Sequence, residues 1–311
     1  MKRIFVLVFL FVSSSLLARA WEIMNVPGKG NSTVTTGNDG PFFAIFMESA
    51  GVRATKLLAG QIYPQGYLQN EGRRGDGWRL VWEDDFNGAE LDAASWSRVP
   101  LGRSDWNDMM SLREDLAYLE DGDLVLLGKV NDGTGADTTR FVTAGVSSRD
   151  KRFFPLARFE VRAKFNHVNG FWPALWLLAQ GQGWPAGGEI DIMEHLNEDD
   201  FVYQTVHSDY SLHVNDSIPP HFTTAPIRVG EYNVYAVEVH PDSLCFSVNG
   251  VHTLTYPRVE GEDGQFPWAD SEFYFILSNQ VGGRWVGPAD KPEQFPTELR
   301  IDWVKVYQKK R

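Results

Sequence analysis

Cysteine is nearly absent from this sequence. The 311-residue chain contains one, Cys245, and a single thiol cannot form an internal disulfide. The fold must therefore depend on its hydrophobic core or on a bound ion. Cys245 lies in the alternating stretch Leu244-Cys245-Phe246-Ser247-Val248, and we expect its thiol to be packed in the core rather than to act as a nucleophile.

Basic residues are also few. The chain has 29 lysines and arginines against 41 aspartates and glutamates, which gives a formal net charge of −12. Nucleic-acid binding needs a basic surface, so we expect no nucleic-acid partner, and a strongly anionic polysaccharide is also disfavoured. Tryptophan, in contrast, is abundant with 11 residues. Flat indole rings suit the apolar faces of pyranose sugars, so the composition favours a carbohydrate ligand.

Long hydrophobic runs are absent after the N-terminus. The run Ile4–Val12 follows Lys2 and Arg3, and the small residues of Ala18-Arg19-Ala20 suit a cleavage site. The run is shorter than the roughly 20 residues that span a bilayer. We predict a signal peptide over residues 1–20, cleaved near Ala20, with export to the periplasm or the medium and no transmembrane segment afterwards. The alternative is a retained membrane anchor.

Helical periodicity is missing from residue 77 onward, where short segments alternate between apolar and polar residues. Turn residues separate them, and Asn249-Gly250 predicts a hairpin. The strongest alternating segments are 78–82, 158–165, 234–239 and 299–307. This pattern predicts an all-β protein, an antiparallel β-sandwich over residues 77–311.

Residues 21–76 differ in composition and form an N-terminal extension of unknown role. Within it, Gly28–Gly40 is rich in Gly, Asn, Ser and Thr and is typical of a flexible linker. Residues 41–70 show no clear period. They are a pro-segment, a short appended strand pair or an extended N-terminus.

Three carboxylates within six residues carry the chemical argument. Glu189, Asp191 and Glu194 are framed by the apolar Ile190, Ile192 and Met193. On a regular strand Glu194 would face away from the other two acids, but a β-bulge around Ile192-Met193 would return it to their face. We predict this bulge, with His195 pointing away from Glu194.

Acids arranged in this way suit glycosidic cleavage with retention of configuration. One carboxylate attacks the anomeric carbon and another protonates the leaving oxygen, with their carboxyl groups roughly 5–5.5 Å apart. Charge repulsion should raise the pKa of one acid, which then serves as the proton donor. The alternatives are a solvated acidic face, a divalent-metal site or a non-catalytic carbohydrate-binding sandwich.

The sequence resembles glycoside hydrolase family 16, whose hallmark is E-x-D-x-x-E. The segment 170–178 is similar to the family's G-x-W-P-A-x-W-L-L, Trp184-Pro185-Ala186 leads into the acids as in the family, and 81–88 and 301–307 are similar to its opening and closing strands. The resemblance implies a concanavalin-like β-jelly roll with a concave substrate cleft and no required cofactor. It implies Glu189 as nucleophile, Asp191 as its partner and Glu194 as acid/base.

The same resemblance suggests further site residues. Trp172 and Trp176 face the same way on one strand and are expected to be sugar platforms, with core packing as the alternative; Trp184 is expected beside them. His207 is expected on the leaving-group side, and the alternative is an ordinary structural histidine. Arg158 is expected to bind a sugar hydroxyl, and the alternative is a surface cation. Some members bind structural calcium, and Asp302 matches their aspartate, although it also suits an ordinary exposed position.

Two segments depart from the pattern of the family's β-1,3-glucanases, namely 103–110 and 277–287. Both resemble the branch of endo-acting O-glycanases of gut bacteria, which cut β-galactosidic bonds in poly-N-acetyllactosamine. By this resemblance Trp106 and Trp285 are sugar-binding rings, and Asn107 and Gln280 read hydroxyls. We therefore predict a monomeric endo-β-1,4-galactosidase acting on mucin-type O-glycans, and the alternative is an endo-β-1,3- or β-1,3(4)-glucanase.

Overall fold

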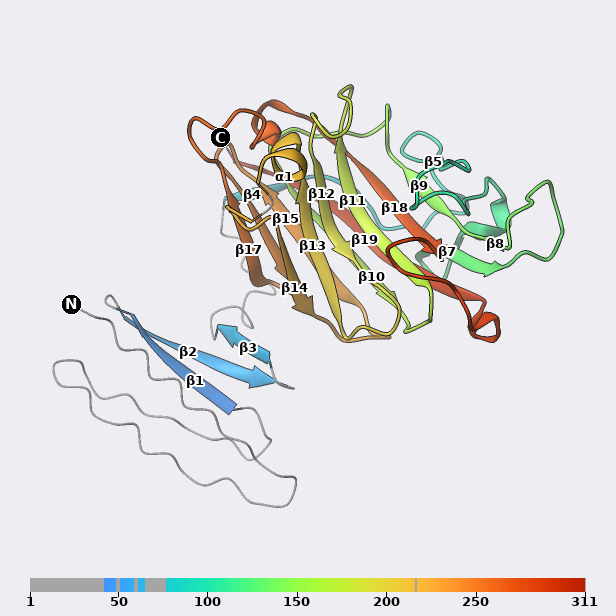
Figure 1. The fold of residues 1–311 in the computed structure, drawn as a ribbon, viewed down its shortest axis with the longest axis horizontal. Helices are drawn as coiled ribbons and strands as arrows, with labels where there is room; N and C mark the ends of the chain where they lie inside the picture. Colours follow the sequence, from blue (N-terminus) through green and yellow to red (C-terminus); the bar gives the residue numbers. More distant parts are fainter. Residues whose placement is uncertain (1–41, 49–50, 59–60, 65–76, 216, 311) are drawn as a thin grey trace, which may run out of the picture. The chain divides into compact units, whose positions relative to one another are not determined.

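The computed structural model describes residues 42–48, 51–58, 61–64, 77–215 and 217–310. The chain divides into two compact units, Met1–Gln69 and Asn70–Arg311. In the first unit, β1 (Phe42–Glu48), β2 (Gly51–Leu58) and β3 (Gln61–Pro64) form a three-stranded antiparallel sheet (Figure 1). Among the alternatives for residues 41–70, the structure agrees best with short appended strands, although it has three of them and not a pair. The predicted signal peptide and the predicted linker lie outside the described residues.

The second unit consists of two antiparallel sheets, so the predicted all-β sandwich is confirmed. The larger sheet has the order β17-β16-β15-β10-β19-β7-β6, with β4 beside β19 and β8 beside β7. Its strands are β4 (Trp78–Asp84), β6 (Ala117–Glu120), β7 (Asp123–Val130), β8 (Phe141–Val142), β10 (Arg158–Phe165), β15 (Asn233–Val239), β16 (Ser243–Val248), β17 (Val251–Pro257) and β19 (Thr297–Lys309). We call it the outer sheet.

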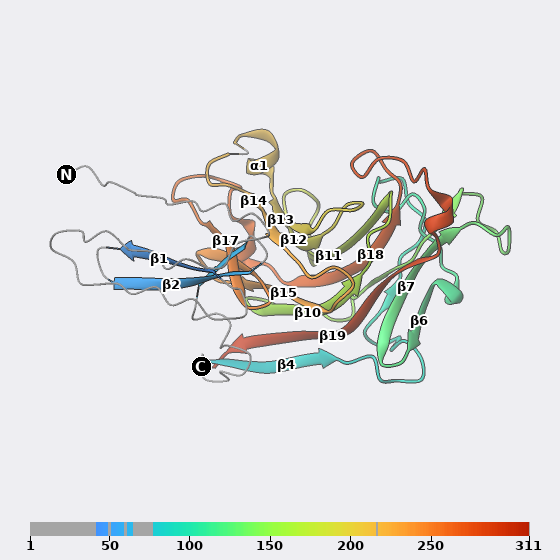
Figure 2. The same cartoon turned by 90° about the horizontal axis from the view of Figure 1, so that it is seen from below.

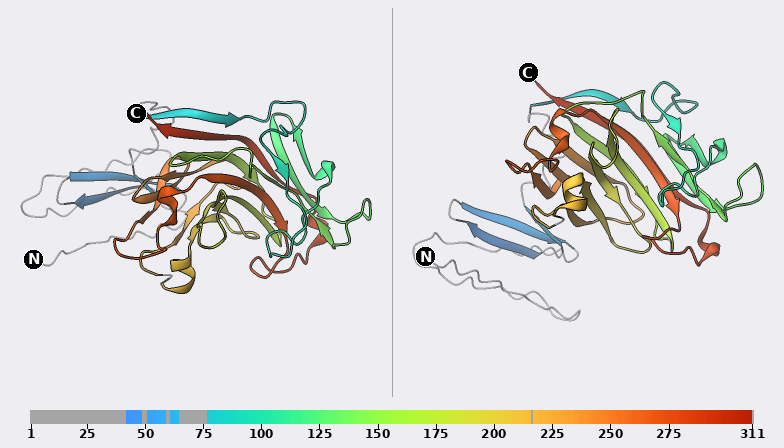
Figure 3. Two further views of the ribbon diagram at one scale, coloured as in Figure 1. Left: turned by 90° about the horizontal axis from the view of Figure 1, so that it is seen from above. Right: turned by 45° about the horizontal axis from the view of Figure 1, so that its top comes forward.

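The smaller sheet, which we call the cleft sheet, has the order β14-β13-β12-β11-β18-β9-β5. Its strands are β5 (Ser97–Arg98), β9 (Gly145–Ser147), β11 (Phe171–Ala179), β12 (Glu189–Glu194), β13 (Phe201–His207), β14 (Phe222–Pro226) and β18 (Phe273–Val281). The helix α1 (Asp209–His213) follows β13. Figure 2 shows β10 and β19 in one layer and β11, β12 and β18 in the other, and Figure 3 shows the strands curving together.

The main core lies between the two sheets. Period-two alternation on β10 sends Phe159 and Val161 inward, where both are fully buried. The Phe159 ring meets Phe275 of β18 across the layers at 5.5 Å between centroids. The register between β10 and β19 brings segments far apart in the sequence together in this core.

The strands β11 and β18 are buried at almost every position, which alternation alone would not give. One face of each contributes to the main core. The other face carries a second apolar cluster that includes Trp172, Trp176 and Ile276. The middle of the cleft sheet is therefore covered on both sides, and the second cluster forms the floor of a cleft.

The hairpin predicted at Asn249-Gly250 joins β16 and β17, and both residues have positive φ, as a type I′ turn requires. The same hairpin corrects the prediction for Cys245. Leu244 and Phe246 are fully buried in the core, so the alternation of β16 places Cys245 on the opposite, partly exposed face. The prediction of a core thiol is therefore wrong.

The ends of the second unit meet in the outer sheet. The first strand, β4, pairs with the last, β19, and Lys310 N donates to Gly77 O at 2.6 Å. Among the described residues, no helix is long and apolar enough to cross a membrane.

Candidate active site

The predicted bulge is present on β12. Leu175 of β11 is paired with Met193 and the next residue, Trp176, with Asp191, so β12 carries one extra residue at this point. The register with β13 shifts over the same stretch. As a result Ile192 and Met193 both lie in the core at 0% exposure. The bulge confirms the prediction that Glu194 returns to the face of the other two acids.

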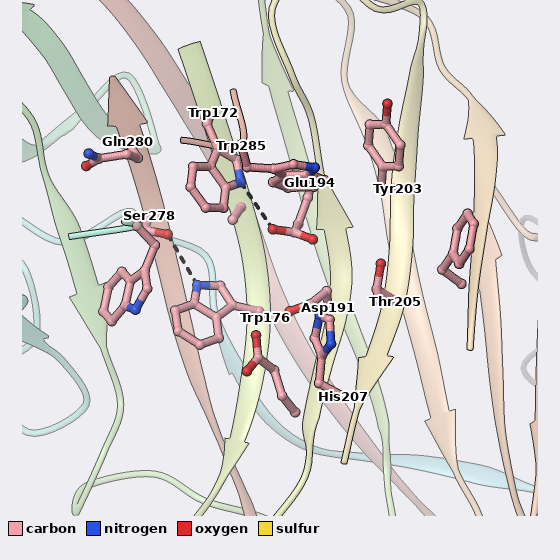
Figure 4. Close-up of a pocket in the computed structure, with 14 residues that line it drawn as sticks. Trp172, Trp176, Asp191, Glu194, Tyr203, Thr205, His207, Ser278, Gln280 and Trp285 are labelled. Atoms are coloured by element: carbon pink, nitrogen blue, oxygen red, sulfur yellow. Dashed lines mark hydrogen bonds and ion pairs between the residues drawn. The ribbon is translucent and has the colours of Figure 1, made fainter. Parts of the chain in front are cut away.

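A cleft of about 520 Å³ lies over this face. Its floor comes from β11, β12, β13, β14 and β18, and two loop tryptophans complete it (Figure 4). The lining side chains are Trp106, Trp172, Ala174, Trp176, Glu189, Asp191, Glu194, Tyr203, Thr205, His207, Phe222, Ser278, Gln280 and Trp285. The three acids therefore share one cleft with most of the predicted aromatic residues.

All three acids favour the protonated form more than free carboxyls do. Burial raises the pKa of Glu194 to about 8, helped by the charge of Glu189 and opposed by a hydrogen bond from Trp172 Nε1 to Glu194 Oε1 at 3.1 Å. Burial also raises the pKa of Glu189 to about 7, while hydrogen bonds from Asp191 and Trp184 oppose the rise. Glu194 thus holds a proton at neutral pH.

Asp191 lies between the two glutamates and is 2% exposed. Burial raises its pKa well above the ordinary value, and the charges of Glu189 and Glu194 add to the rise. Its protonated carboxyl donates a hydrogen bond to Glu189. This bond favours the ionised form of Glu189 and fixes the orientation of that carboxylate.

His207 lies opposite Glu189 on β13, with Nε2 3.4 Å from Asp191 Oδ2 (Figure 4). Burial, with help from His221, lowers the pKa of His207 to about 4, so its imidazole is neutral at pH 7. Ligand atoms of Glu189, Asp191 and His207 all lie within 4.8 Å of one another. A metal site made by all three acids was one of the alternatives. In the structure, the ligand atoms that lie close together come from Glu189, Asp191 and His207, and Glu194 is not among them.

His195 points away from the cleft, as predicted. It is fully buried, with Nε2 2.7 Å from the Asp199 carbonyl oxygen, and its ring stacks with His167.

Aromatic side chains form the cleft walls in two groups. Trp285 packs edge-on against Trp172 at 5.2 Å and against Tyr203 at 5.4 Å. Trp106 packs edge-on against Trp176 at 4.8 Å. Trp285 is 46% exposed, whereas Trp172 and Trp176 are nearly buried and act as floor. These two floor residues therefore belong to an apolar cluster and also line the cleft, and their role as sugar platforms stays a prediction.

Gln280 lies in the cleft with a fixed amide. It is 1% exposed, and its Nε2 donates to Asp108. Its Oε1 has no hydrogen-bond partner among the described residues. Since the lining includes Gln280, this orphaned acceptor is suited to a hydroxyl or amide N–H of a sugar.

Asp105 fixes the loop that carries Trp285. Its carboxylate accepts the backbone N–H of Arg284 at 2.8 Å and that of Trp285 at 3.2 Å. Across the base of this loop, Gly283 and Gly287 exchange backbone hydrogen bonds. The two segments that depart from the glucanase pattern are thus joined to each other in space.

Comparisons with known proteins agree with this architecture. The model of an XgeA-like, catalytic GH16 domain matches residues 156–239. A β-glucanase from Rhodothermus marinus is 30% identical over 74% of this chain and 85% of its own length. The chain belongs to glycoside hydrolase family 16.

Other family 16 relatives differ in specificity. The keratan-sulfate endo-1,4-β-galactosidase of Sphingobacterium multivorum is 32% identical over 74% of this chain, which spans 55% of that relative. A solved non-specific endo-β-1,3(4)-glucanase superposes with a TM-score of 0.67 at 26% identity, covering 75% of this chain and 92% of its own. A structure from work on endo-acting O-glycanases of the human gut microbiota that initiate mucin breakdown has a TM-score of 0.63 at 29% identity, covering 73% and 98%.

The structure corrects two of the predicted sugar contacts. Arg158 lies on β10 of the outer sheet, where its guanidinium contacts Glu160 and Glu238, so the prediction that it binds a sugar in the cleft is wrong. Asn107 is absent from the cleft lining, and its Oδ1 accepts a hydrogen bond from Ser104 N at 3.1 Å. It stabilises its own loop instead of reading a hydroxyl.

Trp184 is 59% exposed and does not line the cleft, but it hydrogen-bonds to the Glu189 carboxyl.

The predicted calcium ligand also has a different partner. Asp302 on β19 forms an ion pair with Arg162 of β10. A guanidinium on this carboxylate disfavours a cation there, so the side chains present do not fit a calcium site at Asp302.

Sequence reasoning missed several cleft residues. Tyr203 and Thr205 alternate with His207 on β13, so period two would have placed them on the same face. Phe222, on the edge strand β14, is 53% exposed and had no such signal. Asp105 and Asp108 were missed because their roles depend on contacts with residues more than 170 positions away.

Proposed function

We propose that this protein is a secreted, retaining endo-β-glycosidase in which Glu189 is the nucleophile and Glu194 the acid/base. The observation that carries the proposal is the bulge, which gathers three acids in one cleft and surrounds Glu194 with groups that keep it protonated. Asp191 is a positioning residue that hydrogen-bonds to Glu189 and favours its ionised form.

The reaction has two steps. Ionised Glu189 attacks the anomeric carbon while Glu194 gives its proton to the glycosidic oxygen, and the leaving sugar departs with a new hydroxyl. Glu194, now ionised, then takes a proton from water, and the resulting hydroxide displaces Glu189 from the anomeric carbon. Both residues return to their starting states and the configuration is retained.

The order of the strands suggests how the substrate lies. Neighbouring strands are about 4.8 Å apart, close to the length of one pyranose. His207, Thr205 and Phe222 on β13 and β14 flank the acids on one side, where the leaving group would lie. Trp176 and Gln280 on β11 and β18 flank them on the other, where the retained sugars would lie.

For the substrate we propose internal β-1,4-galactosidic bonds of poly-N-acetyllactosamine in mucin-type O-glycans. Support comes from the similarity to a keratan-sulfate endo-β-galactosidase and to the O-glycanase structure. The orphaned Gln280 Oε1 adds a buried acceptor that a hydroxyl or acetamido N–H would satisfy. Similarity to β-glucanases makes a β-1,3- or β-1,3(4)-glucanase the second candidate.

A parallel digest tests both candidates. Purified protein is incubated with laminarin, mixed-linkage glucan, keratan-type glycan and mucin O-glycans, and products are sized by mass spectrometry. Oligosaccharides with galactose at the reducing end, released from the glycans alone, are the expected result. Glucose oligomers from laminarin alone would replace the galactosidase proposal with the glucanase.

Two further parts of the proposal have separate tests. Binding of glycan without release of reducing ends would show a non-catalytic sandwich instead of an enzyme. Export is tested by N-terminal sequencing of protein recovered from the periplasm and the medium, where a start at Trp21 is expected; an intact Met1 would contradict cleavage near Ala20.

A further inference from the structure

The hydrogen-bonded pair of Asp191 and Glu189 has a third possible metal ligand beside it in the cleft, the imidazole of His207. Glu189, Asp191 and His207 each present one ligand atom, and these atoms lie within 4.8 Å of one another. Asp191 is 2% exposed, and its Oδ2 has no hydrogen-bond partner among the described residues. A buried carboxyl oxygen without a partner is unfavourable unless a cation or a donor satisfies it.

The geometry suits a small transition-metal ion. Metal–ligand bonds of about 2.0–2.2 Å in a tetrahedron place neighbouring ligand atoms about 3.4 Å apart. His207 Nε2 and Asp191 Oδ2 are 3.4 Å apart. Glu189 would complete a three-ligand set with a small side-chain movement, and the open cleft leaves room for water as the fourth ligand.

The ligand types select among metals. Calcium takes six to eight oxygen ligands and magnesium prefers octahedral oxygen sites, whereas one imidazole with two carboxylates suits zinc or copper. Glu194, the third acid in the cleft, has no place in the cluster and holds a proton at neutral pH, so the two carboxyl ligands must supply the negative charge. The two carboxyl ligands therefore attract a divalent cation, and the imidazole favours a metal that binds nitrogen well.

We propose that Glu189, Asp191 and His207 form an inhibitory binding site for zinc or copper ions inside the catalytic cleft. The bound ion would use the Glu189 carboxylate as a ligand, so this group would no longer be free to attack an anomeric carbon. Metal binding does not depend on the proposed hydrolytic function, but the resulting inhibition does.

Binding is measured directly on the full-length protein. Isothermal titration with ZnCl₂ after EDTA treatment should give one equivalent, and electron paramagnetic resonance of the Cu²⁺ complex should show nitrogen coupling from one imidazole. His207→Gln and Asp191→Asn should each weaken zinc binding at least tenfold, and His207→Gln should remove the nitrogen coupling. Thermal melts in EDTA confirm that each variant is folded.

Two control variants locate the ion. His221→Gln changes the neighbouring imidazole, 6.3 Å from His207 between ring centroids, and should leave zinc affinity unchanged. Cys245→Ser removes a thiol that hydrogen-bonds to His240 on the outer sheet. Zinc affinity lost in Cys245→Ser but kept in His207→Gln would overturn the proposal, as would unchanged affinity in every variant.

Activity is a second, independent readout. Zinc should abolish glycan hydrolysis by the wild-type protein and EDTA should restore it. Stoichiometric zinc binding through His207 with undiminished hydrolysis would contradict the inhibitory role. A protein that hydrolyses no glycan even in EDTA would instead contradict the proposed function, and the titration would still decide the metal site.

Discussion

At the scale of single residues, the cleft distinguishes two glutamates by their hydrogen-bond partners. Glu189 accepts from Asp191 and Trp184, whereas Glu194 accepts from the Trp172 indole and is the more strongly protonated of the two. Donors aimed at a carboxylate favour its charge, and burial opposes it. Two identical functional groups thereby differ in their tendency to ionise, as the proposed roles of nucleophile and acid/base require.

Replacing Glu189, the proposed nucleophile, should separate chemistry from binding. Glu189→Gln keeps the size and the hydrogen-bonding capacity of the side chain but removes its charge. We expect kcat to fall by at least about 10³-fold, with glycan affinity within about threefold of the wild type by titration. Turnover close to the wild-type rate would remove Glu189 from the nucleophile role.

The pH dependence follows from the same pair. The proposed mechanism requires Glu189 ionised and Glu194 protonated, so kcat/KM should rise as pH passes the pKa of about 7 and fall above the pKa of about 8. Because the groups interact, the two limbs belong to the pair. A profile of initial rates from pH 4 to 10 checks this, and an optimum near pH 5 would contradict it.

The raised pKa of Glu194 should also cost stability at alkaline pH. Its pKa is 4.5 in a free chain and about 8 in the fold, so the folded state holds the extra proton between these values and stability falls as pH rises through them. Glu194→Gln removes the ionisable group and with it this pH dependence of stability, while keeping an acceptor for the Trp172 indole. We expect the variant to be more stable than the wild type at pH 8, by up to about 5 kcal/mol for a rise in pKa from 4.5 to about 8, and equal to it at pH 4.

Thermal unfolding at both pH values measures this difference. A Glu194→Gln protein that is less stable than the wild type at pH 8 would show that the carboxyl stabilises the fold instead of straining it.

At the scale of elements, the loop of residues 282–287 depends on a distant carboxylate. Asp105 accepts two backbone N–H groups of this loop, which positions Trp285 against Trp172 and Tyr203. Asp105→Ala should leave these donors without their acceptor and loosen the ring. We expect KM to rise about tenfold with kcat changed less than threefold, as measured on the preferred glycan.

The matched control is Arg284→Ala. The Arg284 side chain is 90% exposed and its Nε is 3.7 Å from Asp105 Oδ1, so this weak surface ion pair should contribute little. If Arg284→Ala raises KM as much as Asp105→Ala does, the backbone anchor is not what positions Trp285.

Elements also show what the sequence could and could not predict. The bulge on β12 was predictable because a regular strand would place Glu194 on the same face as the apolar Ile190 and Ile192. One extra residue in the strand removes this conflict. Cys245 was misplaced although the pattern was sufficient, since Leu244 and Phe246 already define the buried face. Arg158 was misplaced for another reason: its role was taken from the family resemblance, and neither that resemblance nor strand alternation gave the sheet to which its strand belongs.

Side chains whose partners lie far away in the sequence were the least predictable. Asn107 and Gln280 had the same chemistry and the same expected role, yet one stabilises its own loop and the other lies in the cleft. The difference depends on Asp108, which adjoins Asn107 in sequence but binds Gln280 in space. Contacts over such sequence separations are set by the whole fold.

At the scale of the whole molecule, charge should decide between neutral and sulfated glycans. The chain carries a formal net charge of −12. The side chains that line the cleft in the described part of the chain include three acids and no lysine or arginine. Sulfate groups would therefore meet a negative field without a compensating cation.

We accordingly expect neutral poly-N-acetyllactosamine to be cleaved with a kcat/KM at least tenfold higher than its sulfated counterpart at low ionic strength. Because salt screens repulsion between charges, the preference should shrink between about 20 and 500 mM NaCl, mainly through a lower KM for the sulfated glycan. Initial rates on both glycans at both salt concentrations check this. Equal rates at low salt would mean that sulfate lies outside the cleft's field, and a preference unaffected by salt would point to steric exclusion instead of charge.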